Sequence, residues 1–378
     1  MMPDRILRLV PALTLRETLG IALLSAVLAL GFTLWTEQPV TSRAQAGALQ
    51  PVGLSGPFSE AWSLYRQRHI DANGRVVDGG SKGISHSEGQ GYAMVLAVYA
   101  GDRATFQTIW SWTQANLGVR PDGLFAWKWD PEARPHVPDP NNATDGDILI
   151  AWGLALAGAT WKEPSFTASA RRLMTSIEAL LGHQRGYGLM MPPGAVGFGP
   201  SERPDGPVVN LSYWVFPALD AFAILDPTGP WTELSLSGRR LVEVARLGPL
   251  GLPPDWVSIG EQKPRVASGY EPVFGYNAVR IPLYLAMSGD AKPLIRPYSG
   301  LWSPEGDLGP HVIDIRTGSA GGEFGGRGFK TVMALARCIE TGERIPAPLR
   351  QPDPKDAYYP ATLALLALIA LNERHSSC

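Results

Sequence analysis

The chain has 378 residues, of which 45% are hydrophobic and 18% are charged, which is enough apolar material for a large core. Its formal net charge is −2, and no cluster of Lys and Arg argues for a nucleic-acid partner. Twelve Trp and eleven Tyr favour a neutral partner such as a sugar, because flat apolar rings with a polar edge suit sugar faces. The six His show no metal-ligand spacing, so we expect neither a metal nor a cofactor.

The N-terminus is typical of an export signal. Three arginines precede an uncharged apolar run over residues 19–35, and Ala44-Gln45-Ala46 is a small-x-small cleavage site. The run of 17 residues is at the short limit for a membrane span, so an uncleaved anchor is the alternative. We therefore expect a signal peptide or membrane anchor over residues 1–46 and one catalytic domain over 47–378. Either alternative makes the protein periplasmic or secreted.

The periodicity of apolar residues predicts helices joined by long loops rich in Gly, Pro and aromatic residues. A turn over residues 71–75 is expected to join two short strands, and 290–301 is ambiguous. Paired helices of this kind are typical of an α/α barrel, an all-α fold whose loops form a groove at one end. The predicted helices are 58–68, 94–100, 102–117, 145–159, 165–181, 213–225, 233–246, 277–287, 325–340 and 357–373.

Two cysteines are present. Cys338 lies in an apolar helical pattern and is predicted to be a buried thiol, whereas Cys378 ends the chain. One bridge between them is possible in an oxidising compartment, and the sequence leaves the pairing open.

The stretch Ser87-Glu88-Gly89-Gln90-Gly91-Tyr92 places one carboxylate among small residues where a loop turns into an apolar helix. Ser87 is a good helix cap, and the glycines allow close approach of another backbone or a ligand. The structural alternative is that Glu88 only complements the positive end of the helix dipole.

Four further loop-to-helix junctions have a similar composition, and they lie at residues 123–130, 141–147, 210–214 and 275–280. Together with the Glu88 stretch and Ala-Thr-Asp-Gly-Asp at 143–147, they resemble glycoside hydrolase family 8, in particular bacterial endo-β-1,4-glucanases that accompany cellulose synthase. The resemblance implies an (α/α)6 barrel with short β-hairpins in its loops, a groove for a β-1,4-glucan, and hydrolysis with inversion. It also makes the cellulose synthase complex a candidate partner.

By this resemblance, Glu88 is the general acid that donates a proton to the glycosidic oxygen. Because this role requires a raised pKa, we expect burial by Tyr92 and loop tryptophans to outweigh the helix dipole. Asp145 matches the second acidic residue of the family, which binds and distorts the sugar at the cleavage point. Asp147 is expected to have only a structural role in the first turn of its helix.

Several aromatic residues are predicted to contact the sugar, with packing in the core as the alternative for each. Arg280 lies one helical turn from Asn277 and is expected to face the same groove or to pair with an acid. Besides these two, the predicted substrate-binding residues are Tyr92, Trp127, Trp129, Tyr213 and Tyr276.

The chain departs from the family pattern at Asn277, where the best-studied branch has the aspartate that serves as general base. An amide cannot take a proton from water, so the base must lie elsewhere. The loop before this helix offers Asp255, Glu261 and Glu271 as candidates.

The sequence leaves two alternatives to an endo-β-1,4-glucanase open. A pseudoenzyme would bind nascent glucan and help its export without cutting it. A family 8 hydrolase of xylan, mixed-linkage glucan (lichenan) or chitosan would keep the chemistry and change the sugar.

Overall fold

The computed structural model describes residues 53–378 except 261–262, 291, 303–309 and 352, and these residues belong to one compact unit, Leu49–Cys378. The predicted signal or anchor over residues 1–46 lies outside the described residues and stays a prediction. In the part that is described, no helix is both long enough and apolar enough to cross a membrane.

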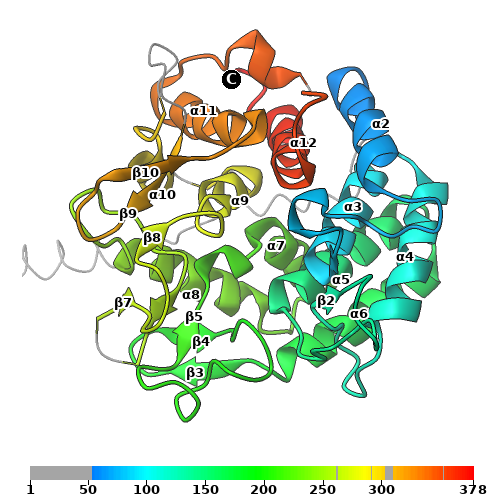
Figure 1. Ribbon diagram of the computed structural model, residues 1–378, viewed down its shortest axis with the longest axis horizontal. Helices are drawn as coiled ribbons and strands as arrows, with labels where there is room; N and C mark the ends of the chain where they lie inside the picture. The colour runs from blue at the N-terminus through cyan, green and yellow to red at the C-terminus, as the bar shows by residue number, and fades with distance from the viewer. Residues whose placement is uncertain (1–52, 261–262, 291, 303–309, 352) are drawn as a thin grey trace, which may run out of the picture. The chain divides into compact units, whose positions relative to one another are not determined.

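A ring of largely buried helices forms the centre of this unit (Figure 1). Each packs against the next, and α12 returns to α3 to close the ring. Because α3, α5 and α12 are apolar on almost every face, they are stable only when other helices surround them. The helices of this ring are α3 (Ser87–Tyr99), α5 (Thr144–Thr160), α7 (Phe216–Leu225), α9 (Arg280–Ser288) and α12 (Tyr358–Glu373).

Amphipathic helices cover the ring. Helix α4 packs on α3, α6 on α5, α8 on α7 and α2 on α12, while α11 contacts both α9 and α12. The buried residues of α6 recur at helical spacing, so one stripe faces the ring and the rest faces water. These helices are α2 (Pro57–His69), α4 (Arg103–Leu117), α6 (Pro164–Glu178), α8 (Trp231–Val244) and α11 (Arg327–Thr341), and the short α10 (Lys292–Ile295) lies beside α9.

Glycines allow α3 and α5 to pack closely. A Cβ on Gly91 would lie 2.8 Å from the amide nitrogen of Ile150, and one on Gly153 would lie 2.9 Å from the Cβ of Met94. At the N-terminal ends of the two helices, a Cβ on Gly146 would lie 2.8 Å from the amide nitrogen of Glu88. This close packing brings the first turns of α3 and α5, and with them Glu88 and Asp145, side by side.

The strands are short and antiparallel, and they lie in the loops. The single-turn helices η1 (Gly79–Ser81), η2 (Leu211–Tyr213), η3 (Arg296–Tyr298) and η4 (Ala347–Arg350) also lie there. The sheets are β1 (Ser85–His86) with β2 (Lys128–Trp129), β3 (Gly182–Gln184) with β4 (Gly188–Met190), β5 (Val208–Val209), β6 (Val257–Ser258) and β7 (Arg265–Val266) in that order, and β8 (Val273–Phe274), β9 (His311–Asp314) and β10 (Ala320–Glu323) with β9 in the middle.

The structure corrects some local predictions. Ser87 is the first residue of α3 and not its cap, and its buried Oγ has no hydrogen-bond partner in the described part of the chain. Helix α9 begins at Arg280 and not at Asn277, so Pro282 lies in its first turn, where a missing N–H costs little. The turn over 71–75 is present, but its flanks form only one bridge, between Ile70 and Val76.

Cys338 and Cys378 form a disulfide with their Cα atoms 5.7 Å apart. Both residues are buried, so the prediction of a free buried thiol at Cys338 is wrong. The bond joins the last residue of the chain to α11, and the sequence did not decide this pairing because the two residues are 40 positions apart.

Candidate active site

An open cleft lies where α3, α5, α9 and α12 begin, and its volume is about 640 Å³. The N-terminal ends of inner helices therefore converge on it, with the positive ends of their dipoles. Its polar and aromatic lining residues are Asp78, Ser81, His86, Ser87, Glu88, Trp127, Asp145, Tyr213, Tyr276, Asn277, Arg280, Phe329, Tyr358 and Tyr359.

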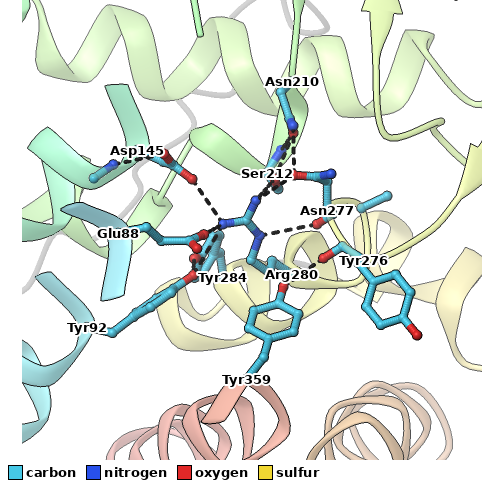
Figure 2. Close-up of polar contacts among 12 residues, drawn as sticks. Glu88, Tyr92, Asp145, Asn210, Ser212, Tyr276, Asn277, Arg280, Tyr284 and Tyr359 are labelled. Carbon is cyan, nitrogen blue, oxygen red and sulfur yellow. Dashed lines mark hydrogen bonds and ion pairs between the residues drawn. The ribbon is translucent and has the colours of Figure 1, made fainter. Parts of the chain in front are cut away.

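Arg280 is the centre of the polar network in this cleft (Figure 2). Its Nη1 forms ion pairs with Glu88 and with Asp145, at 3.0 Å from Oδ2 of Asp145. Its Nη2 donates to Oγ of Ser212 at 2.7 Å and to Oδ1 of Asn277 at 2.9 Å. The prediction that Arg280 faces the groove or pairs with an acid is confirmed on both counts.

The two carboxylates differ in access. The side chain of Glu88 is 21% exposed, whereas that of Asp145 is 3% exposed. Both acids contact the same nitrogen, Nη1 of Arg280. An inverting glycosidase has its base on the opposite face of the sugar, with room for a water and roughly 6.5–9.5 Å from the acid, so we do not assign Asp145 as the base that opposes Glu88.

The two acids of α5 are similarly buried and differ in their contacts. Desolvation raises the pKa of Asp145 to about 7, partly offset by the N–H of Gly146, which donates to its Oδ1 at 2.8 Å. The pKa of Asp147 is raised to about 7 by the same cause. Asp147 accepts from Phe125 N at 2.8 Å and from Asn142 Nδ2 at 2.9 Å, so it ties two loops to α5, in agreement with a structural role.

The candidate bases lie in three different situations. Asp255 is buried, which raises its pKa, and it accepts hydrogen bonds from the backbone beside Asn277. Glu271 is exposed and does not line the cleft as described. Glu261 lies outside the described residues. The identity of the base thus stays a prediction.

The predicted aromatic contacts divide into two groups. Trp127, Tyr213 and Tyr276 line the cleft, and Tyr276 is 51% exposed. Tyr92 is fully buried behind Arg280, where its hydroxyl contacts Tyr284 and lies 3.4 Å from Arg280 Nη1, so it supports the arginine and does not face the cleft.

Trp129 lies outside the described cleft lining, and its ring stacks on His136 and meets the edge of Trp112. The burial of Tyr92 contradicts its predicted contact with the sugar, whereas the predicted contact of Trp129 stays a prediction.

Four further residues of this region are not among the predicted site residues: Asp78, Ser212, Tyr358 and Tyr359. Ser212 lies in a junction that was singled out for Tyr213, and Tyr358 and Tyr359 open α12 as Glu88 opens α3. The hydroxyl of Tyr359 donates to the backbone oxygen of Tyr276 at 2.7 Å and so holds this exposed ring (Figure 2). The sequence signal for Tyr358 and Tyr359 was a pair of aromatic residues at the start of a helix. No motif marks Asp78.

No group of three His, Cys, Asp or Glu is placed to hold a metal ion among the residues that the structure describes. The network of Arg280 is instead suited to proton transfer and to hydrogen bonding with a neutral polar ligand.

Comparisons with known proteins agree with this geometry. The model of glycosyl hydrolases family 8 matches residues 39–373. A probable endoglucanase of Novacetimonas hansenii is 35% identical over 344 residues, which cover 87% of this chain and 98% of the relative. Two solved structures superpose with a TM-score of 0.76: an endo-β-1,4-glucanase of Acetobacter xylinum, 35% identical, over 84% of this chain and 98% of the other, and a family 8 endoglucanase of Klebsiella pneumoniae, 32% identical, over 83% and 99%.

Proposed function

The chain belongs to glycosyl hydrolase family 8, and we propose that its cleft cuts internal β-1,4 bonds of a glucan chain with inversion, with Glu88 as the general acid. The family match and the relatives confirm the predicted (α/α)6 barrel and the predicted class, a glycoside hydrolase of the endo-1,4-β-glucanase type. The observation that carries the proposed role of Glu88 is its position: it is the partly exposed carboxylate of the pair held by Arg280.

In this mechanism Glu88 must hold a proton when the sugar is bound, against its ion pair with Arg280, which favours the charged form. The protonated carboxyl gives this proton to the glycosidic oxygen while the bond to the anomeric carbon breaks. Water attacks that carbon from the opposite face and loses a proton to a base. Glu88 becomes a carboxylate in this step, and Arg280, already in contact with it, stabilises the new negative charge without reorganisation. Asp145 and the ring of Tyr213 hold the sugar at the cleavage point.

The location of the protein forms a second part of the proposal. The N-terminal sequence favours export, and the Cys338–Cys378 disulfide is of a kind that persists in oxidising compartments such as the periplasm. We place the enzyme in the periplasm or outside the cell, where it acts on a β-1,4-glucan and in connection with the cellulose synthase complex. Fractionation of cells that express the full chain, with detection by antibody, tests this location, and a cytoplasmic signal would contradict it.

A reducing-end assay on carboxymethylcellulose tests the activity. The wild-type chain should release reducing ends, with the α-anomer as the first product seen by NMR, and Glu88→Gln should be almost inactive. A wild-type chain without turnover on this substrate, with xylan, lichenan and chitosan as comparison, or a fully active Glu88→Gln, would overturn the proposal.

One observation favours a second candidate, a glucan-binding protein without turnover. The residue across Arg280 from Glu88 is Asn277, which lines the cleft with an amide and not with a base. Tight binding of cellopentaose without release of reducing ends would support this candidate, and measurable turnover would remove it.

A further inference from the structure

Asp255 lies directly behind the residue that replaces the expected base. It is 8% exposed, and its Oδ1 accepts from the backbone N–H of Gly275 at 2.8 Å and of Ala278 at 2.7 Å. Its Oδ2 lies 3.4 Å from Nδ2 of Asn277. Because both oxygens are engaged with the segment that leads into α9, the carboxylate holds this segment in place.

The contacts of Asn277 fix which way its amide points. Its Oδ1 accepts from Nδ2 of Asn210 at 3.0 Å and from Nη2 of Arg280 at 2.9 Å, and both of these groups can only donate there. Its Nδ2 donates to Asp255, which can only accept. A flipped amide would face two donors with its N–H group and a carboxylate with its oxygen, so the observed orientation is strongly preferred.

The amide nitrogen Nδ2 of Asn277 carries two hydrogens, and only one of them is directed at Asp255. Within the described part of the chain the other hydrogen has no protein acceptor, and Asn277 lines the cleft. The cleft therefore meets an N–H donor at position 277. An acceptor oxygen, either of a sugar hydroxyl or of a water molecule, is the chemistry that this group can bind.

We infer that Asp255 is a positioning residue that fixes Asn277 as a hydrogen-bond donor to an acceptor oxygen in the cleft and holds Arg280 against Glu88 and Asp145. Asp255 acts through Asn277 and the start of α9, and it does not itself contact the reacting atoms, because it is buried and its oxygens are engaged. This inference rests on the proposed function for its substrate, a β-1,4-glucan.

The contacts between the two side chains can form with the amide and the carboxylate exchanged, but the N–H that faces the cleft is then lost. In Asp255→Asn/Asn277→Asp, Oδ1 of the residue at 255 still accepts from Gly275 and Ala278, and its Nδ2 donates to the new carboxylate. That carboxylate still accepts from Asn210 and Arg280. In Asp255→Asn alone, two N–H groups face each other at the 3.4 Å contact, so Asn277 is no longer fixed.

The experiment compares the wild type, Asp255→Asn and the double variant by kcat and KM on carboxymethylcellulose and by calorimetric binding of cellopentaose. Asp102→Asn is the control, because Asp102 caps α4 through Thr105 N at 3.1 Å and does not line the cleft. Asp255→Asn should lower kcat/KM and weaken cellopentaose binding about tenfold, the effect of one lost charged hydrogen bond. The double variant should not recover cellopentaose binding, because a carboxylate at position 277 offers no N–H to the cleft, and Asp102→Asn should change neither quantity.

Wild-type kinetics and binding in Asp255→Asn, or a double variant that binds cellopentaose as tightly as wild type, would overturn the inference. If the wild-type chain shows no turnover, the proposed function fails, but the order of the cellopentaose affinities still decides the inference.

Discussion

The positive charge of Arg280 is compensated differently on its two sides. On the side of α3 and α5, two carboxylates contact the guanidinium directly, and one positive charge serves both. On the side where α9 begins, an amide contacts the guanidinium and the carboxylate of Asp255 stands one hydrogen bond behind it. A third carboxylate at Arg280 would add like charge to a buried site, so the amide at position 277 allows the two acids to share the arginine.

Removal of the arginine should have the largest effect on stability. Arg280→Met leaves Glu88 and Asp145 without their counter-ion in a buried site, and the loss of one partner from a buried ion pair typically costs about 3–5 kcal/mol. We expect this decrease in the free energy of unfolding, measured in urea at pH 7. A decrease within 1 kcal/mol, on the order of an exposed ion pair, would show that the network does not stabilise the fold.

A carboxylate on the amide side should make stability depend on pH. In Asn277→Asp, two carboxylates would stand where the present contact is 3.4 Å, so one of them keeps a proton at neutral pH. The folded variant then binds more protons than the unfolded chain, and its stability falls as the pH rises.

The measurement for Asn277→Asp is the free energy of unfolding in urea relative to wild type. The deficit should be larger at pH 8 than at pH 5, by about 1–3 kcal/mol. An equal deficit at both values would mean that position 277 is not coupled to Asp255.

Asp147 provides a weaker test on the carboxylate side. Its pKa is about 7 in the folded chain against an ordinary value of 3.8, so the folded chain binds the extra proton between these values. This contribution to stability is present below about pH 4 and is lost as the pH rises toward 7. Asp147→Asn cannot titrate, so its unfolding midpoint should fall less steeply from pH 5 to 7 than that of wild type. An unchanged slope would exclude this titration.

The smallest effects are expected from the aromatic rings. Tyr276→Ala removes an exposed ring at the cleft and should weaken cellopentaose binding by about 3–10-fold, the value of one stacking contact. Trp129→Ala should leave the affinity unchanged and lower stability, because Trp129 packs against Trp112 and His136. Weaker cellopentaose binding with unchanged stability in Trp129→Ala would show that Trp129 contacts the sugar.

The sequence predicted the elements that depend on local signals. The periodicity of apolar residues predicted helices at 145–159 and 357–373, which the structure has as α5 and α12, and the glycines beside Glu88 indicated close approach at the start of α3. The spacing of Asn277 and Arg280 correctly placed both side chains in one network.

The sequence could not predict features that depend on distant segments. Tyr92 and Tyr276 occupy similar junctions, yet one is fully buried and the other is 51% exposed, because the loops around them differ. The contact between Asp255 and Asn277 spans 22 residues and depends on how the loop before α9 folds back. The Cys338–Cys378 bond was likewise hidden by chain distance.

The most direct test of Glu88 as the general acid compares two leaving groups. Glu88→Gln and wild type are assayed on cellopentaose, whose leaving sugar needs a proton, and on 2,4-dinitrophenyl β-cellotrioside, whose leaving group departs as a stable anion. We expect Glu88→Gln to lose about 10²–10⁴-fold in kcat/KM on cellopentaose and far less on the aryl substrate. Equal losses on both substrates, or no loss on cellopentaose, would contradict proton donation by Glu88.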